Sequence, residues 1–314
     1  MSLESEVKQL EISGVLKRQV KEKSLNHAYL FVCEDKVLRQ ELILDFIEDI
    51  LNNQAQVKAK SHPDLTIIEN DKQIGVKDVL DMVSDIYLAP IEADYKVYYI
   101  DDFSLASEQA QNKLLKTIEN PPQSAIIILG ATQTNKILQT IISRVSMYFI
   151  DGLSNEIIKN VLITDGVEVR EAEIVASACN NNITIAQSLV NDKQFIEVYN
   201  LALNQFKLKS SRDVLPFLSQ FNLAKIQLNV YFDLTISFAR DIMMVLANKP
   251  ELVNSHARID ELIEISQEFN LVSIVKIIKE AILSKENLKV FVSAQSVLDE
   301  FLLKEVEVKV KCKK

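Results

Sequence analysis

The stretch from residue 96 to residue 144 constrains the fold of this 314-residue chain more than any other. It opens with an apolar strand pattern at residues 97–100 (VYYI), continues with a helical pattern at 109–119, and returns to an apolar run at 125–129 (AIIIL). Two buried strands joined through a helix are typical of a parallel βαβ unit, because parallel strands need a long crossover connection. Strand and helix patterns alternate from residue 27 to residue 150, which predicts an α/β domain with a mostly parallel sheet.

Polar side chains follow both strands of this unit. Asp101 and Asp102 end the first strand, and Thr132 follows the second. Ligands of parallel sheets bind beyond the carboxyl ends of the strands, so a nucleoside triphosphate would be handled here. The two acids could hold Mg²⁺, which prefers oxygen ligands, or they could cap and pair locally. The turn described next favours the local role.

The first strand-to-helix turn of the chain lacks a phosphate-binding loop. The pattern GxxxxGK[ST] belongs at such a turn, because bare backbone must wrap the phosphates and a lysine must reach them. Laid down by position, Cys33 and Leu38 stand where the glycines would be. Arg39 stands for the lysine and Gln40 for the hydroxyl that binds Mg²⁺. The turn therefore carries a degenerate form of the pattern.

The chemistry of this turn argues against a bound nucleotide. Bulky side chains at the glycine positions would collide with a phosphate, and Glu34 and Asp35 would repel it. The whole chain has only five glycines, far below the usual content of about 7%. Arg39 could replace the missing lysine, but we expect it on a solvated face of the helix. Cys33 could be a reactive thiol near a helix N-terminus or simply buried. We predict no bound cofactor.

Composition excludes several classes of protein. A net charge of −9 argues against a dedicated nucleic-acid binder, which needs clustered Lys and Arg. Cys33, Cys179 and Cys312 form no CxxC pair, and His27 and His62 have no third ligand at a useful spacing, so no metal site is predicted. No apolar run approaches the roughly 18 residues of a membrane span, and the N-terminus lacks the apolar core of a signal peptide. We expect a cytoplasmic protein with no membrane association.

The strand patterns end near residue 152. Three short helical patterns follow, and the last third carries four apolar stripes at helical spacing, which predicts a helical bundle. We expect three domains, at residues 1–152, 153–203 and 204–314. One predicted core stripe of the bundle comprises Leu271, Ile274, Val275, Ile278, Ala281 and Ile282.

Four motifs in order carry a resemblance to a known family. They are HAYLF from His27, HPDL from His62, AQNKLLKTIENPP from Ala110, and the pair Ser143-Arg144. Together they resemble the clamp-loader subunits of bacterial DNA polymerase III, over the first 150 residues in sequence and beyond them in layout. A degenerate phosphate loop beside an intact Ser-Arg pair resembles the delta-prime type, since gamma/tau subunits keep a working loop and delta subunits lack the pair.

This resemblance implies an architecture and a role. It implies an AAA+ domain of the P-loop NTPase type over 1–152, a small helical lid over 153–203, and a helical collar over 204–314. The collar would join gamma/tau and delta subunits in a hetero-pentameric ring that loads the sliding clamp onto primed DNA. A delta-prime-type subunit would not be an enzyme on its own, but a component of the DNA-directed DNA polymerase III holoenzyme.

The resemblance also assigns roles to single residues. Arg144 would be an arginine finger, a permanently charged group that stabilises the phosphoryl transferred on a neighbouring gamma/tau subunit. The alternative is an arginine that pairs with an acid and caps a helix. Ser143 would orient the loop rather than do chemistry. Thr132 would be a sensor remnant or an ordinary strand-end hydroxyl, and Asp102 stands where active AAA+ enzymes carry a catalytic Glu.

Further departures from the family pattern lie outside this pair. Thr184 falls near the position of a nucleotide-sensing Arg, Val145 replaces the Cys that usually follows the Ser-Arg pair, and the four zinc-binding cysteines of many members are absent.

Two rival functions stay open. One is a weak ATPase of the gamma/tau type that uses Asp101, Asp102 and Arg39. The other is an AAA+-like scaffold in DNA repair.

Overall fold

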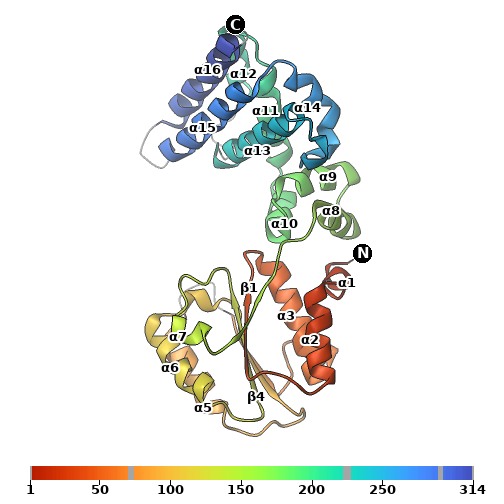
Figure 1. Cartoon of the computed structure of the whole chain (residues 1–314), viewed down its shortest axis with the longest axis vertical. Coiled ribbons are helices and arrows are strands. Elements are labelled where there is room, and N and C mark those ends of the chain that lie inside the picture. The colour runs from red at the N-terminus through yellow and green to blue at the C-terminus, as the bar shows by residue number, and fades with distance from the viewer. Residues whose placement is uncertain (1, 70–73, 222–227, 289–292, 313–314) are drawn as a thin grey trace. The chain divides into compact units, whose positions relative to one another are not determined.

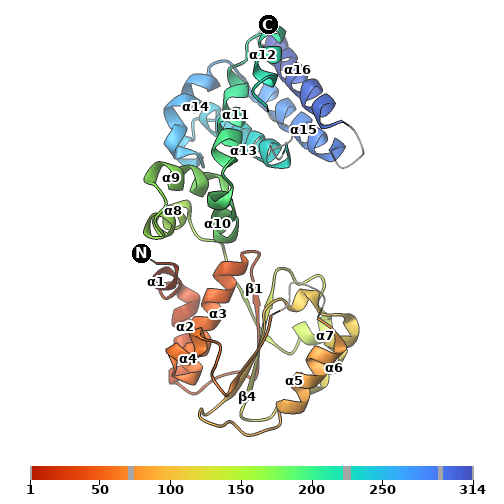
Figure 2. The same cartoon turned by 180° about the vertical axis from the view of Figure 1, so that it is seen from behind.

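The computed structural model describes residues 2–69, 74–221, 228–288 and 293–312. Figures 1 and 2 show the chain from two opposite sides. The chain divides into two compact units. The first comprises Met1–Asp165 with Asn181–Ile185, and the second comprises Gly166–Asn180 with Ala186–Lys314. The finer division into domains at residues 152 and 203 stays a prediction.

A five-stranded parallel sheet forms the centre of the first unit. Its strands lie in the order β2-β3-β4-β1-β5, and each neighbouring pair is parallel. The bounds are β1 (Ala28–Val32), β2 (Leu65–Ile68), β3 (Lys96–Ile100), β4 (Ala125–Ala131) and β5 (Ser146–Phe149). The three central strands are buried along their whole length, as expected for a sheet covered on both faces. The predicted parallel α/β domain is confirmed.

Helices cover both faces of this sheet (Figure 1). On β1, Tyr29 and Phe31 point to one face and contact the ring of Phe46 in α3, whereas Leu30 and Val32 join the core beneath α5, α6 and α7. The helices of the first unit are α1 (Leu3–Val7), α2 (Glu11–Lys21), α3 (Lys36–Leu51), α4 (Gln54–Lys58), α5 (Val76–Asp85), α6 (Glu108–Glu119), α7 (Gln139–Ile142) and α8 (Asn155–Thr164), with the 3₁₀ helix η1 (Phe103–Leu105).

The HPDL motif fixes a loop at the start of β2. The Nδ1 atom of buried His62 accepts the Asp64 N–H at 3.1 Å. The fully buried Asp64 carboxylate accepts the N–H groups of Ile91, Glu92 and Ala93 at 2.6, 2.7 and 2.8 Å. Burial alone would raise the pKa of Asp64, but these three hydrogen bonds outweigh it and lower the pKa. Both side chains therefore have structural roles.

The described residues beyond the sheet are helical, which confirms the predicted helical C-terminal region. Their helices are α9 (Val169–Ala178), α10 (Ile183–Asn191), α11 (Phe195–Asn204), α12 (Ser211–Leu218), α13 (Leu228–Leu246), α14 (Ile259–Ser266), α15 (Leu271–Asn287) and α16 (Ala294–Cys312), with the 3₁₀ helices η2 (Gln205–Lys207), η3 (Pro250–Leu252) and η4 (His256–Arg258). In the described part of the chain, no helix combines the length and the apolar character that crossing a bilayer requires.

The predicted core stripe on α15 is wrong in part. The helix buries Ile274, Ile277 and Ala281. Three predicted members of the stripe are 41–48% exposed, namely Leu271, Val275 and Ile282. Apolar residues occur on several sides of this helix, so their spacing does not by itself decide which side meets the core.

Candidate functional site

The turn after β1 is too short to cradle a phosphate. β1 ends at Val32 and α3 begins at Lys36, so only Cys33, Glu34 and Asp35 lie between strand and helix. Three residues do not supply the run of bare backbone N–H groups that wraps a triphosphate. Leu38, Arg39 and Gln40 are therefore inside α3 and not in a loop. Cys33 and Leu38 are both buried, and burial is the main cause that raises the pKa of the Cys33 thiol.

A carboxylate of this chain occupies the N-terminus of α3, where a phosphate would bind. Asp35 is buried and caps the helix, with Oδ1 accepting the Leu38 N–H at 3.2 Å. The same oxygen accepts the Thr184 hydroxyl at 2.7 Å, and Oδ2 accepts the Ile183 N–H. The Thr184 oxygen in turn accepts the Val37 N–H at 2.9 Å. The backbone N–H groups at this helix N-terminus, which would bind the anion in a phosphate site, are thus hydrogen-bonded to Asp35 and Thr184 of the same chain.

Arg39 is buried, and the predicted solvated position is wrong. Its side chain is fully buried, with Nη1 donating to the Cys33 carbonyl at 2.8 Å and Nη2 lying 3.6 Å from Asp101 Oδ1. α3 packs several of its sides into the first unit, so the helical pattern alone did not distinguish a solvated face. Gly130 makes room, because a Cβ there would lie 2.9 Å from Arg39 Nε and 2.2 Å from the Asp101 carbonyl oxygen.

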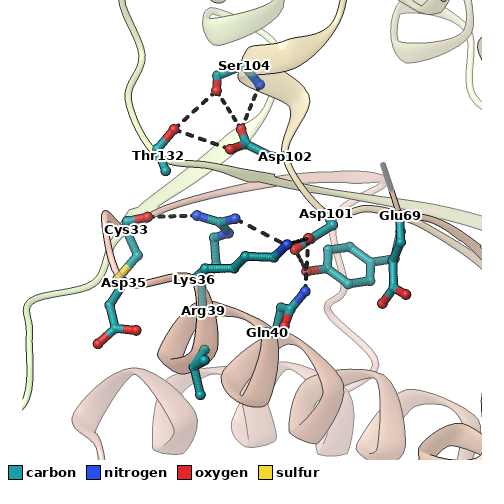
Figure 3. A network of polar contacts seen from close by, with 12 residues as sticks. Cys33, Asp35, Lys36, Arg39, Gln40, Glu69, Asp101, Asp102, Ser104 and Thr132 are labelled. Carbon is teal, nitrogen blue, oxygen red and sulfur yellow. Dashed lines mark hydrogen bonds and ion pairs between the residues drawn. The ribbon is translucent and has the colours of Figure 1, made fainter. Parts of the chain in front are cut away.

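Asp101 is fully engaged by protein groups. Besides Arg39, its carboxylate accepts the Gln40 amide at 2.9 Å and the Tyr99 hydroxyl at 2.8 Å, and it lies 3.6 Å from Lys36 Nζ. Figure 3 shows the side chains of Lys36, Arg39 and Gln40 converging on Asp101. Burial, and then the Asp101 charge, hold the pKa of Tyr99 well above its ordinary value. Gln40 and Asp101, at the positions of two Mg²⁺-binding groups, bind each other.

Asp102 and Thr132 form a second local group with Ser104 (Figure 3). Asp102 Oδ1 accepts both the N–H and the hydroxyl of Ser104, at 3.1 and 2.5 Å, and caps η1. Thr132 Oγ1 lies 3.3 Å from Asp102 Oδ2 and 3.1 Å from Ser104 Oγ. The sequence reasoning missed Ser104, although an acid two residues before a serine is a turn signal. Neither acid is left open for a magnesium ion, so this chain does not fit Mg²⁺-ATP at these positions.

Arg144 lies on the surface, held by local contacts. Its Nε is 3.1 Å from Glu119 Oε1, and its Nη1 donates to the Thr140 carbonyl at 2.9 Å and to Ser143 Oγ at 3.0 Å. Ser143 also donates to the Thr140 carbonyl. The Arg144 side chain is 39% exposed. Glu119, the partner that sequence reasoning missed, is the last residue of α6 and the only acid of the AQNKLLKTIENPP motif.

Arg144 lies far from the turn after β1. The turn follows β1, whereas Arg144 precedes β5, and the two strands are parallel with Val32 beside Phe149. Only Ser146–Phe149 is strand, and at about 3.3 Å per residue it places its first residue about 10 Å from its last. Arg144 therefore lies toward the end of the sheet opposite to the turn after β1.

No metal cluster is found in the described ranges, where no three His, Cys, Asp or Glu side chains are grouped as ligands. His62 is occupied by the Asp64 N–H, as described above.

Comparison with known proteins gives sequence matches in the first unit. Residues 8–154 match the family described as DNA polymerase III, delta subunit. The chain is 30% identical over 207 residues to DNA polymerase III subunit tau of Bacillus subtilis, covering 60% of this chain and 37% of the relative. It is 28% identical over 163 residues to subunit gamma of Buchnera aphidicola, covering 50% and 44%. The chain thus spans less than half the length of these relatives.

Two solved structures resemble the chain weakly. A DNA polymerase III gamma subunit-related protein of Thermotoga maritima gives a TM-score of 0.46 at 17% identity, covering 94% of this chain and 99% of the other. The DNA clamp loader delta protein of Bacillus subtilis gives a TM-score of 0.38 at 13% identity, with the same coverage. At such low scores the family assignment depends on the sequence matches.

Proposed function

We propose that this chain is the delta-prime-type subunit of a bacterial DNA polymerase III clamp loader, and the match of residues 8–154 to the family described as DNA polymerase III, delta subunit, supports this proposal. In this role it does not hydrolyse ATP. It supplies Arg144 as an arginine finger to ATP held by a neighbouring gamma/tau subunit while the sliding clamp is loaded during DNA replication.

The observation that carries this proposal is the occupied N-terminus of α3. A triphosphate would have to displace the buried Asp35 carboxylate from the Leu38 and Ile183 N–H groups. It would also meet the Thr184 hydroxyl, which blocks the Val37 N–H. A phosphate beside an unmoved carboxylate would be repelled, and a displaced carboxylate would lose three or more hydrogen bonds. Nucleotide binding is therefore disfavoured in this chain.

The position of Arg144 supports action on another subunit. Its guanidinium is accessible and precedes β5, toward the end of the sheet opposite to the turn of its own chain. Its charged partner is Glu119, an exposed carboxylate, and such exposed pairs are weak. A phosphate can accept the same bidentate, charge-assisted hydrogen bonds and carries more negative charge, so it could replace Glu119 as the partner of Arg144. After such an exchange, the Arg144 side chain would keep its hydrogen bond to the Ser143 hydroxyl.

The partners follow from the same proposal. They are gamma/tau and delta subunits in a hetero-pentameric ring, with the sliding clamp and primed DNA as the substrates of the assembly. The lid at 153–203 and the collar at 204–314 belong to this proposal, as does a cytoplasmic location. The collar would meet neighbours through apolar side chains that the bundle leaves exposed, such as Leu271, Val275 and Ile282.

The decisive experiment compares reconstituted complexes that contain wild-type chain or Arg144→Ala. We expect normal assembly, and a fall of about 10³-fold or more in ATP turnover at the site beside this subunit, the range known for arginine fingers. Lys136→Ala, which removes another exposed cation of the same unit, should leave the rate unchanged. An unchanged rate with Arg144→Ala would refute the finger.

A weak ATPase of the gamma/tau type is the second candidate, and the similarity to tau and gamma subunits favours it. Calorimetric titration of the isolated chain with Mg²⁺-ATP separates the two, because the delta-prime proposal expects no saturable binding. Binding at micromolar ATP, or hydrolysis by the chain alone, would favour the ATPase. Co-purification with replicase subunits separates both from a scaffold in DNA repair.

A further inference from the structure

The C-terminal helix α16 buries an acid and a base one helical turn apart. Glu305 and Lys309 are 2% and 3% exposed. Residues four apart lie on the same side of a helix, with their Cβ atoms about 6 Å apart. The two side chains are therefore close enough to pair, and burial of a charge is costly unless it is paired. Their contacts in the second unit are nevertheless different.

Lys309 holds the segment between α11 and α12. Its Nζ donates to the Phe206 carbonyl at 2.9 Å and to the Leu208 carbonyl at 3.1 Å. It also lies 4.7 Å from the centroid of the Phe269 ring, a distance at which the ring face attracts a cation. Phe206 is the middle residue of η2, and Leu208 follows its last residue. The lysine thus binds η2 to the C-terminal helix.

A second buried contact binds η2 to α13. Gln205, the first residue of η2, is fully buried, and its amide donates to Thr235 Oγ1 at 2.6 Å. Its side-chain oxygen accepts the hydroxyl of Tyr231, which is also fully buried. Burial, and then the Glu305 charge, hold the pKa of Tyr231 well above its ordinary value. Glu305 therefore acts on the same cluster of buried polar groups that fixes η2.

Glu305 has an unsatisfied polar atom in this cluster. Its Oε2 has no hydrogen-bond partner among the described residues. Burial raises the pKa of Glu305 to about 8, against the opposing effect of Lys309. At neutral pH the carboxyl is therefore mostly protonated and carries no charge that would attract Lys309. The ammonium is left to the backbone carbonyls at η2.

A cavity borders Lys309. It has a volume of about 300 Å³, and the acids Glu264 and Glu268 line it together with the lysine. Glu305 is not among its lining residues, so these two acids face Lys309 and not Glu305. Close packing is interrupted at a cavity, and the lysine side chain therefore has room to change its rotamer.

The charged groups of the helices that pack against α16 are engaged elsewhere. Glu280 of α15 pairs with Lys304 at 3.0 Å. Asp213 of α12 accepts two backbone N–H groups at the start of its own helix. The other charged side chains of α12 and α15 are exposed or paired at the surface, namely Arg212, Lys276, Lys279, Lys285 and Glu286. Lys309 is thus the cation that acts on Glu305.

We propose that Glu305 and Lys309 form a pH switch that releases η2 from α16. While Glu305 is protonated, Lys309 binds the carbonyls of Phe206 and Leu208. When Glu305 gives its proton to solvent, its carboxylate attracts the ammonium, because a full charge attracts a cation more strongly than carbonyl dipoles do in a buried site. The two carbonyls then lose their donor, and η2 loosens. This inference does not depend on the proposed function.

The test measures hydrogen exchange of the full-length chain at about pH 7 and about pH 9.5, corrected for the pH dependence of intrinsic exchange. We expect exchange at residues 205–210 to become at least tenfold faster at the higher pH, including the Leu208 N–H that donates to the Gln205 carbonyl. Glu305→Gln should abolish the acceleration. Glu307→Gln, which removes an exposed acid of the same helix, should preserve it. No acceleration, or the same acceleration in Glu305→Gln, would overturn the switch.

The midpoint of the response identifies the group that titrates. Exchange measured across a pH series should change with a midpoint near 8, the value for Glu305. A midpoint above about 10 would mean that a lysine loses its proton instead, and would overturn the inference. Lys309→Met should give fast exchange at residues 205–210 at both pH values, because it removes the donor from the two carbonyls. Slow exchange in this variant would equally contradict the switch.

Discussion

Arg39 and Arg144 carry the same guanidinium group in two regions of the first unit that differ in access. Arg39 is fully buried after β1 and is held by the Cys33 carbonyl and the Asp101 carboxylate. Arg144 is 39% exposed before β5 and is held by an exposed glutamate and two oxygens of its own loop. The first cation is paired with an internal acid, whereas the second is paired with an acid at the surface.

Under the proposed function, this difference would explain how a nucleotide-binding fold can lose its own ligand and still act on ATP held by a neighbour. Around Arg39, charges that would face ATP and Mg²⁺ are paired within the chain, so that Asp101 forms an ion pair with Arg39 at 3.6 Å and accepts hydrogen bonds from Gln40 and Tyr99. Around Arg144, the contacts are weak and open to solvent. Each prediction below strengthens or breaks this contrast between a closed and an open region.

The largest expected effect is on stability when the closed region loses its cation. Arg39→Met should lower the free energy of unfolding by about 3–5 kcal/mol, because it leaves the buried Asp101 charge without its buried partner. Arg144→Met should cost less than about 1 kcal/mol, as expected for an exposed pair. Urea denaturation of both variants checks this, and equal losses would break the contrast.

A buried acid in the second unit, unlike Asp101, has a carboxylate oxygen without a hydrogen-bond partner among the described residues. Glu305 in α16 is buried, its Oε2 has no hydrogen-bond partner among the described residues, and burial raises its pKa to about 8, against the opposing effect of Lys309. The folded chain therefore holds this proton more tightly than the unfolded chain, so stability is lost as pH rises from about 4.5 to about 8. Glu305→Gln should flatten this loss in denaturation measured at several pH values. An unchanged pH profile would contradict the burial of an uncompensated acid.

A smaller effect is expected at the cap of α3. Asp35→Ala should cost about 0.5–2 kcal/mol, the usual range for loss of a helix N-cap. It should also speed hydrogen exchange at Ile183, whose N–H is bonded to Asp35. Glu34→Ala, which removes the exposed acid of the same turn, should change neither quantity. Equal effects of the two substitutions would show that Asp35 has no special role at the turn.

The smallest effect is expected at the open region. Glu119→Ala should change stability by less than about 1 kcal/mol, because it removes one exposed ion pair. It should not lower ATP turnover by the complex, since Arg144 keeps its bonds to Thr140 and Ser143. A loss of turnover as large as that of Arg144→Ala would mean that Glu119 positions the finger.

Much of the first unit was predictable, for a local reason. Apolar runs such as 125–129 were recognised as buried strands because strands covered on both faces need apolar residues throughout. The degenerate turn was recognised because Cys33 and Leu38 occupy positions where only glycine lets a backbone approach phosphate. The clamp-loader family was likewise recognisable from four short motifs, and the sequence matches confirm it.

What could not be predicted depends on contacts between residues distant in the sequence. Asp35 looked like a repulsive acid in the turn, and its bonds to Ile183 and Thr184 join positions almost 150 residues apart. Arg39 was expected in solvent because no local sequence pattern predicts that the Asp101 carboxylate and the Cys33 carbonyl lie beside its guanidinium. Met147 and Phe149 on β5 are exposed because the helices that cover this face of the sheet do not extend to the edge strand. The residue pattern of β5 alone does not predict this exposure.

The amino-acid sequence by itself determined the parallel sheet, the altered turn and the presence of a Ser-Arg pair, because each depends on residue types at short spacing. Only the tertiary structure decided which arginine is enclosed and which is accessible. Enclosure of a charge requires partners brought together from separate strands and helices, and their pairing is a property of the folded chain alone.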